Sequence, residues 1–198
     1  MSKSKYTAAI LLPYKEIYSS NFSGAASIWV KDYLKKSSLK KKTLVYGYLD
    51  KKLKPLTDNF RNLLIKRTIF SKSKKYAENF LSECKKRNFD IIEIHNRAET
   101  LNYLIDNNVQ SKLIFVFHNN PQEIRGSKLV KQRLNILEKT DKIFFVSLWT
   151  KKKFFENLPF SNKSNCEILY PSMSKIKKFN SNKKKQIIFT GKLNSSKG

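Results

Sequence analysis

The sequence predicts an α/β fold, Rossmann-like, with a parallel β-sheet that carries helices on both faces. Short apolar segments alternate with longer segments in which apolar residues recur every three or four positions, the pattern of strands alternating with helices. The strand-like segments are unbroken apolar runs, as expected for strands buried on both faces. The chain has 198 residues, 40% of them hydrophobic, which is enough for one domain with a sizeable core. Right-handed crossovers would join its parallel strands.

The first strand and helix are predicted at the N-terminus. Lys5 to Leu12 reads as a strand, Pro13 to Phe22 as a polar loop, and Ser23 as the N-cap of the helix that follows. A helix start of this kind can hold a phosphate on its free backbone amides, and Gly24 would let a phosphate approach closely. A plain strand-to-helix turn explains a single glycine equally well. The apolar face of this helix would consist of Ala26, Trp29, Val30, Tyr33 and Leu34.

The next two segments are a strand and a basic stretch. Thr43 to Tyr48 predicts the second strand. Lys51 to Phe70 is basic with spaced apolar residues, and we expect a helix packed on the sheet with a solvated basic face. The alternative is an amphipathic helix at an anionic membrane surface.

Strands and helices continue to alternate through the rest of the domain. A helix with an apolar face around Phe80 ends in a cluster of cations, which complement the helix dipole. The remaining predicted elements are the strand Asp90 to His95, the helix Ala98 to Ile105, the strand Lys112 to Phe117, the helix Lys128 to Lys139, the strand Lys142 to Ser147, the helix Thr150 to Asn157 and the strand Glu167 to Tyr170.

Polar residues follow two of these predicted strands. His118 comes directly after the central run KLIFVF, and Asn119 follows it. An earlier predicted strand ends in His95, followed by Asn96 and Arg97. Open α/β sheets bind ligands outside the carboxyl ends of their strands, so this edge is the candidate site. From the residues alone, we interpret His118 as a strand-end ring bonded to a loop carbonyl, and a functional histidine is the alternative. We interpret His95 as structural, and the three other residues either line a cleft or cap loops.

The composition is strongly basic, with 41 Lys and Arg against 15 Asp and Glu and a formal charge of +26. Such a charge favours anionic partners: nucleic acid, anionic lipid or phosphorylated substrates. The basic residues are spread along the chain, and no nucleic-acid motif is recognisable, so the charge alone identifies no partner. No apolar run approaches a membrane span. Cys84 and Cys166 have no metal spacing and are interpreted as reduced, in a cytoplasmic protein.

The C-terminal part predicts a change of domain. Residues 1–174 would form the first domain and residues 175–185, which are basic and lack periodicity, a linker. Residues 186–198 read as a fresh strand, QIIFT, and a glycine turn that opens a second, truncated α/β unit.

The order of these segments resembles glycosyltransferase family 4, retaining enzymes of GT-B architecture. The matching motifs are SGAAS after the first strand, DIIEIHNR, KLIFVFHNN, TDKIFFVSLWTKKKFF, EILYPSMS and GKLNSSKG, the last resembling the family's "G-R-L-x-x-x-K-G". They cover nearly the whole chain, and their order and spacing carry the likeness. The pieces HNR and HNNPQEIRG look most like enzymes of cell-surface polysaccharide or lipopolysaccharide assembly.

The resemblance implies roles for individual residues. Gly24 would lie against the donor diphosphate, His118 would hydrogen-bond the transferred sugar, and Lys192 and Lys197 would neutralise the departing diphosphate. Lys192 stands where the family has arginine, so the planar bidentate fork is lost. Ala25 stands where a second glycine is common. The family's pair of glutamates lies in the second domain, beyond this sequence.

The expected function is therefore that of a hexosyltransferase fragment, an acceptor-side domain with the first strand of a nucleotide-sugar-binding domain. It would use a nucleotide-sugar as co-substrate and a glycan or lipid-linked acceptor, with no metal and no cofactor, at the cytoplasmic face of a membrane. Alone, it would be inactive or nearly so. The alternative is a basic α/β domain that binds nucleic acid or an anionic membrane.

Overall fold

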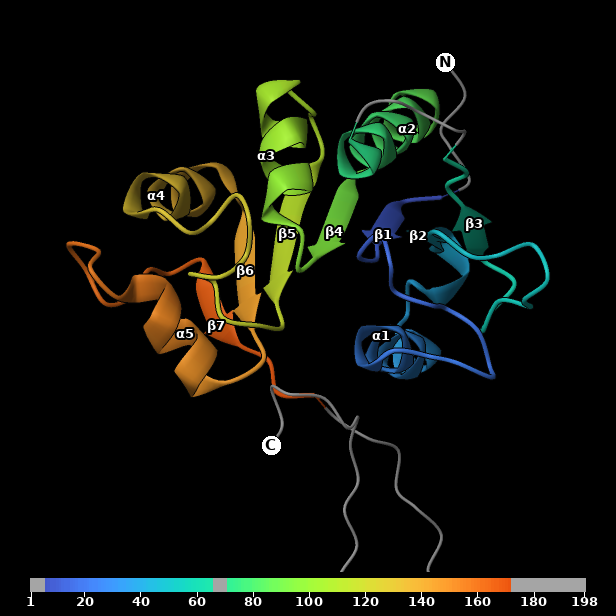
Figure 1. Cartoon of the computed structure of the whole chain (residues 1–198), viewed down its shortest axis with the longest axis horizontal. Coiled ribbons are helices and arrows are strands. Elements are labelled where there is room, and N and C mark those ends of the chain that lie inside the picture. The colour runs from blue at the N-terminus through green and yellow to red at the C-terminus, as the bar shows by residue number, and fades with distance from the viewer. Residues whose placement is uncertain (1–5, 66–70, 172–198) are drawn as a thin grey trace, which may run out of the picture.

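The computed structural model describes residues 6–65 and 71–171. Strands and helices alternate along most of this part of the chain (Figure 1). The elements are β1 (Ala8–Leu11), α1 (Ala25–Lys36), the 3₁₀ turn η1 (Lys40–Lys42), β2 (Thr43–Gly47), β3 (Phe60–Asn62), α2 (Lys72–Arg87), β4 (Ile91–His95), α3 (Ala98–Asp106), β5 (Lys112–Phe117), α4 (Val130–Lys139), β6 (Lys142–Phe145), α5 (Leu148–Phe155) and β7 (Cys166–Ile168).

The strands form one seven-stranded sheet in the order β3-β2-β1-β4-β5-β6-β7, and every neighbouring pair is parallel. The predicted Rossmann-like α/β class is confirmed. The order reverses direction at β1, whose two neighbours are β2 on one side and β4 on the other. A reversal of this kind leaves a crevice at the carboxyl ends of the strands, where ligands of open α/β sheets bind.

Alternate side chains of β1 and β2 enter two separate cores. On β1, Ala9 and Leu11 belong to one core, while Ile10 belongs to the other. Helices α2, α3, α4 and α5 supply the first core, and α1 supplies the second through Val30 and Leu34. The sheet is thus covered on both faces, as predicted, with one helix on the second face and four on the first.

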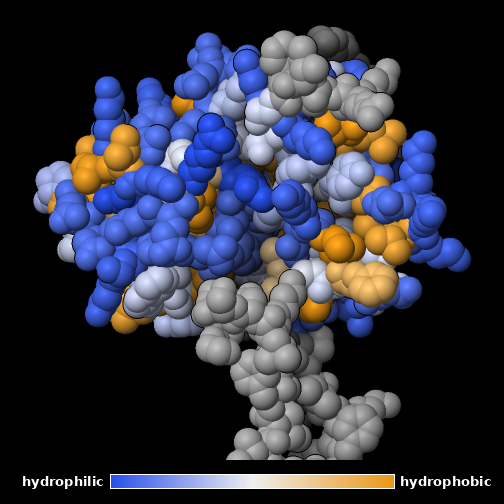
Figure 2. All heavy atoms as spheres, viewed as in Figure 1, coloured by the Kyte–Doolittle hydropathy of each residue, from blue (hydrophilic) through white to orange (hydrophobic). Residues whose placement is uncertain are grey.

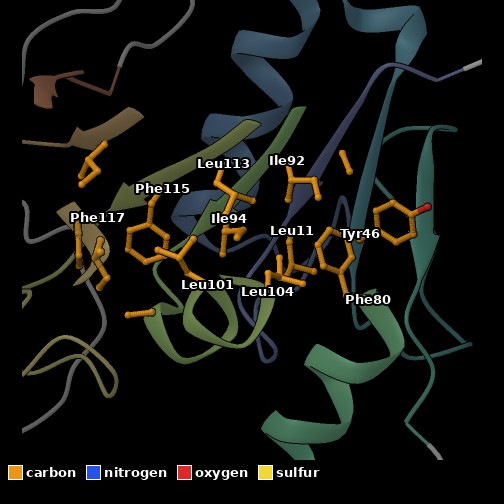
Figure 3. Close-up of a cluster of buried hydrophobic side chains, with 14 of the residues drawn as sticks. Leu11, Tyr46, Phe80, Ile92, Ile94, Leu101, Leu104, Leu113, Phe115 and Phe117 are labelled. Atoms are coloured by element: carbon orange, nitrogen blue, oxygen red, sulfur yellow. The ribbon is translucent and has the colours of Figure 1, made fainter. Parts of the chain in front are cut away.

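The larger core holds the central strands against α2 and α3. Figure 3 shows Ile94, Leu113 and Phe115 of the sheet beside Leu101 and Leu104 of α3. Each of these side chains is at most 4% exposed. Burying one aliphatic or aromatic side chain stabilises the fold by about 1.5–3 kcal/mol.

Residues 51–65 do not form the predicted helix. They form turns and the short strand β3, which pairs with β2 through Val45 opposite Phe60. Its Asn62 side chain both accepts from and donates to the backbone of Leu49, at 3.1 and 2.6 Å, which ties the loop to the strand. Apolar spacing that mimicked a helix instead places Phe60 and Leu63 into the two cores. Residues 66–70 lie outside the described ranges.

Ser23 does not cap α1, contrary to the prediction. Gly24 is the N-cap residue, and the Ser23 hydroxyl instead donates to the backbone oxygen of Ser19. Ser147 does cap α5, by accepting a hydrogen bond from the backbone nitrogen of Thr150 at 3.1 Å. Helix α5 therefore begins two residues before the predicted start.

Hydrophilic side chains cover most of the face in Figure 2, and apolar ones lie there in small separate groups. None of the helices in residues 6–65 and 71–171 combines the length and apolar character needed to cross a membrane. Cys84 and Cys166 are free and buried, and burial raises the pKa of their thiols to about 12 and about 11. The predicted linker, the second unit, Lys192 and Lys197 lie outside the described residues.

Candidate functional site

The carboxyl ends of β4 and β5 lie side by side and are tied together by Asn96. His95 is paired with Val116 across the two strands, and the Asn96 nitrogen donates to the Val116 oxygen at 2.9 Å. Asn96 has φ of 53°, a left-handed conformation that asparagine tolerates well. Its side-chain oxygen accepts from the backbone nitrogens of His118 and Asn119, at 3.1 and 3.2 Å. This bracing sets the direction in which His118 leaves the strand.

Both histidines of the chain belong to one chain of hydrogen bonds. Nδ1 of His95 lies 2.8 Å from Nε2 of His118, and Nε2 of His95 lies 2.6 Å from a carboxylate oxygen of Glu93. The Tyr33 hydroxyl donates to the same Glu93 oxygen. His95 is fully buried, whereas His118 is only partly buried, so the chain runs from the interior to the edge of the sheet.

Helix α1 closes the second face over these rings. The Trp29 ring stands edge-on to both imidazoles, with centroids 5.6 Å from His95 and 5.2 Å from His118. Trp29 and Tyr33 are one helical turn apart, so the same face of α1 supplies the aromatic wall and the phenol. The predicted apolar face of α1 is thus confirmed, and part of it serves the site.

The environment holds His118 neutral at neutral pH. Burial, and then the charge of His95, lower the pKa of His118 to about 3. Burial and the negative charge of Glu93 raise the pKa of Tyr33 well above its ordinary value. Tyr33 therefore remains a protonated donor to Glu93.

A cavity of about 350 Å³ lies at this edge, and His118 is not among the residues that line it. It brings together the predicted residues Asn96, Arg97 and Asn119. The other lining residues are Tyr14, Ser73, Tyr76, Glu99, Thr100, Glu123, Ile124 and Arg125. A larger cavity, of about 550 Å³, lies at the amino ends of the strands. Of its lining residues, Asp90 directly precedes β4 and Lys112 begins β5. We favour the smaller one, because ligands of open α/β sheets bind at the carboxyl ends.

Arg97 offers this cavity an uncompensated cation. Its Nε atom is buried and has no hydrogen-bond partner, and no carboxylate within the described ranges forms an ion pair with its guanidinium. The adjacent Glu99 is paired with Arg125 at 2.8 Å. The side chain is half-buried, and an anionic group of a ligand that reached it would form a charge-assisted hydrogen bond.

Gly24 lies at the start of α1, and a carboxylate already occupies the space in front of it. Glu16 accepts a hydrogen bond from the backbone nitrogen of Ser27 at 3.0 Å. A Cβ on Gly24 would fall 2.1 Å from a Glu16 oxygen. Negative charge at a helix N-terminus is favourable, and here a side chain supplies it. A phosphate bound at Gly24 would have to displace Glu16.

Sequence reasoning missed Glu93, Tyr33 and Trp29 as neighbours of the histidines. A signal for Glu93 was present, because positions 93 and 95 are polar on alternate residues of an otherwise apolar strand and so share one face. Nothing in the sequence pairs that face with α1. Glu123 of the cavity lining is exposed and accepts a hydrogen bond from Asn120 at 3.0 Å.

Residues that could bind a metal do not gather in the described part of the chain. Residues 6–65 and 71–171 contain no group of three or more His, Cys, Asp and Glu side chains placed to hold an ion. That the protein works without a metal stays a prediction.

Comparison with solved structures shows where this fold occurs. No protein-family model matches the sequence, and no curated protein matches it either. The fold is similar to sucrose-phosphate synthase from Thermosynechococcus elongatus (TM-score 0.55, 12% identity, covering 83% of this chain and 48% of that one). In a second structure of that protein, 88% of the solved chain is covered (TM-score 0.56, 11% identity, 83% of this chain). It is also similar to HepE from Anabaena, solved with UDP and glucose (TM-score 0.59, 13% identity, 85% of this chain and 45% of that one).

The chain thus spans less than half of HepE and of the longer sucrose-phosphate synthase structure. At these identities the likeness is one of fold, and it agrees with the Rossmann-like half of a GT-B glycosyltransferase that the sequence predicts.

Proposed function

We propose that this chain is the acceptor-side domain of a retaining glycosyltransferase of family 4 that moves a hexose from a nucleotide-sugar to a glycan or lipid-linked acceptor. One observation carries the proposal: His118, Asn96 and Arg97 gather at the carboxyl edge of a Rossmann-like sheet. The fold likeness to HepE, which was solved with UDP-glucose, supports the ligand class. The motif order from SGAAS to GKLNSSKG supports the family.

His118 would hydrogen-bond the transferred sugar. Its ring is held from behind by His95 and from the side by Trp29, so little freedom is lost when a sugar binds. A neutral imidazole can accept from one hydroxyl without adding charge to the site. The positive character that develops on the sugar in the transition state would then meet no opposing cation on His118.

The 350 Å³ cavity at the carboxyl edge would hold the acceptor. At about 350 Å³ it matches the lower end of the range for small-molecule sites, and its lining is polar, which suits a sugar. The guanidinium of Arg97 would bind an anionic group of that acceptor, such as the phosphate of a lipid-linked sugar.

The donor diphosphate would approach the start of α1. Gly24 lies there, and displacement of Glu16 would free the helix amides for phosphate. Lys192 and Lys197 would add positive charge from the second unit, so that the departing diphosphate is stabilised as the glycosyl–phosphate bond breaks.

Saturation-transfer NMR on the 198-residue chain tests whether this chain contacts the sugar of the donor rather than its nucleoside. With UDP-glucose and GDP-mannose as probes, we expect the sugar protons to receive more saturation than the nucleoside protons, because the nucleoside pocket is assigned to the second domain. A His118→Ala variant should lose the sugar signal, whereas Glu78→Gln, which is paired with Lys75 on α2 and does not line the cavity, should keep it. Saturation confined to the nucleoside, or none at all, contradicts the proposal.

The chain alone is expected to transfer little or no sugar. Donor-binding residues of the second domain are needed to hold the nucleotide, and positioning contributes much of an enzyme's rate. Incubation with radiolabelled UDP-glucose or GDP-mannose and lipid-linked acceptors would measure this. Turnover at ordinary enzyme rates would overturn the expectation of a half-enzyme.

The charge of +26 favours a second candidate function, a basic domain that holds nucleic acid or an anionic membrane. Nucleic-acid binding would weaken steeply with salt, because each phosphate contact releases a counterion. Binding to single-stranded DNA and to anionic vesicles, measured across salt concentrations, separates these cases. Contact with anionic lipid is also compatible with the enzyme, which we place at the cytoplasmic face of a membrane.

A further inference from the structure

Four side chains from α1, β4 and the end of β5 form one line of hydrogen bonds. Tyr33 and His95 both contact the same oxygen of Glu93, and His95 contacts His118 through its other nitrogen. Trp29 covers both rings edge-on, which shields them from water on that side. The order of donors and acceptors in such a line is fixed by its end members.

The inner end of the line is an acceptor. A carboxylate has no proton to give when ionised, and this oxygen of Glu93 lies within hydrogen-bond reach of the Tyr33 hydroxyl and of Nε2 of His95. With both rings neutral, Nε2 of His95 therefore carries hydrogen and its Nδ1 carries a lone pair. Nδ1 of His95 can then only accept, so Nε2 of His118, 2.8 Å away, must carry hydrogen.

The outer end of the line is then a lone pair on Nδ1 of His118. None of the described residues hydrogen-bonds this atom, and it is not among the buried side-chain atoms left without a partner. His118 is partly exposed and is followed by Asn119, which lines the 350 Å³ cavity. Within the described ranges, Nδ1 is thus the ring nitrogen of His118 that remains free to accept from a ligand.

We propose that Glu93 and His95 are positioning residues that hold His118 in the tautomer with hydrogen on Nε2, so that Nδ1 accepts a hydrogen bond from a sugar hydroxyl. The tautomer assignment stands on the hydrogen-bond geometry alone, and the hydroxyl as ligand rests on the proposed function. A site built this way rejects a sugar that lacks the hydroxyl, because the lone pair would lose its donor.

The same line of hydrogen bonds predicts which histidine holds a proton that the pair takes up. When Nδ1 of His118 gains a proton, Nε2 passes its own proton to Nδ1 of His95, which becomes an imidazolium beside the Glu93 carboxylate. His118 stays neutral, now with hydrogen on Nδ1, and the number of protons balances. The titratable groups that face the rings are Glu93 from β4 and Tyr33 from α1; the neighbouring strand β6 presents Phe144, beside Val116.

The test is a long-range ¹H–¹⁵N NMR spectrum of the labelled 198-residue chain at neutral pH, with no ligand added. The chain has only two histidines, so two imidazole patterns appear, and His118→Gln assigns them. We expect both rings to carry hydrogen on Nε2 and a lone pair on Nδ1. Hydrogen on Nδ1 of His118, or a charged His118 ring, would overturn the proposal while leaving the sugar-binding test above unaffected.

A variant tests the role of the carboxylate. Glu93→Gln removes the charge with little change of shape, so the first proton taken up by the pair should bind at least tenfold more weakly, a fall of one pH unit or more in its midpoint. Glu167→Gln, on β7 and paired with Lys142, is the matched control and should leave the midpoint unchanged. Equal midpoints in the two variants contradict a positioning role for Glu93. Should Glu93→Gln fail to fold, the tautomers seen in the NMR spectrum of the wild-type chain still test the proposal.

Discussion

At the scale of single residues, two histidines at one sheet edge differ because of what touches them. His95 is fully buried and bonded to a carboxylate, while His118 is partly open, and its ring is bonded to the other imidazole and to no further group in residues 6–65 and 71–171. Two rings in contact cannot easily both be charged, so they titrate as a pair. The folded chain therefore resists the second proton, and burial adds to that resistance.

Because the folded chain resists protonation, its free energy of unfolding should fall as the pH is lowered. The pKa of His118 is lowered to about 3, so between that value and about 6.5 the unfolded chain binds more protons than the folded one. The free energy of unfolding should fall by about 1.4 kcal/mol for each unit as the pH drops below 6.5.

Urea denaturation at pH 6.5 and pH 5, a window in which carboxylates stay mostly ionised, measures this slope. His118→Gln keeps a donor near Nδ1 of His95 and removes the ring whose pKa is lowered, so its slope should be shallower than that of the wild-type protein. A wild-type slope as flat as that of the variant would rule out the assignment.

At the scale of elements, most strands and helices lie where the apolar patterns predict them, and the segment 51–65 is the exception. Helix α2 buries the residues its periodicity indicates, because a sixteen-residue helix repeats the signal over several turns. Strand β3 has three residues, of which only Phe60 is buried, so it leaves no two-residue alternation to detect. Its neighbours Leu63 and Leu64 then mimic a helical face. The sequence could not reveal that Asn62 ties this segment to Leu49.

The two serines compared above give a prediction about helix caps. Ser147→Ala removes the acceptor for the backbone nitrogen of Thr150 and should lower the free energy of unfolding by about 1 kcal/mol. Ser23→Ala removes no cap and should cost less than half as much. Chemical denaturation of both variants measures the difference, and a larger loss for Ser23→Ala would contradict the cap assignment.

The loop that borders the candidate cavity depends on Gly126. This residue has φ of 92°, and a Cβ there would fall 2.6 Å from the backbone nitrogen of Glu99 at the start of α3. Gly126→Ala should therefore lower the free energy of unfolding by about 1–3 kcal/mol, since both the conformation and the space are unfavourable.

A suitable control is Gly47→Ala, whose new methyl would meet only side chains of Phe60 and Leu12, at 3.0 Å or more. Thermal unfolding of the two variants compares them. The interpretation fails if Gly126→Ala is as stable as the wild-type protein.

At the scale of the whole molecule, the fold class and the edge that carries the site could be predicted from sequence. Polar residues after two neighbouring strands must meet at one edge of a parallel sheet, so Asn96, His118 and Asn119 were placed together correctly. The contribution of α1 could not be predicted, because the register between a helix and a sheet depends on packing rather than on a local pattern. Trp29, Tyr33 and the line through Glu93 belong to that missing part.

The charge of the molecule also acts at this scale. The net charge of +26 draws anionic ligands toward every face, so affinity alone does not identify a site. The place on the molecule where an anionic ligand binds distinguishes the two candidate functions. A sugar-nucleotide enzyme must bind at the carboxyl edge, whereas a general phosphate-binding surface would spread over exposed lysines.

The most direct measurement is therefore a backbone-amide NMR titration of the ¹⁵N-labelled chain with UDP-glucose at physiological salt. The account predicts shifts concentrated at the carboxyl edge, at His118, Asn119, Asn96 and Arg97, with further shifts near Gly24. Shifts scattered over lysine-rich surfaces that vanish as salt is raised, with the signals of His118 and Asn119 unmoved, would contradict a sugar-binding site at this edge.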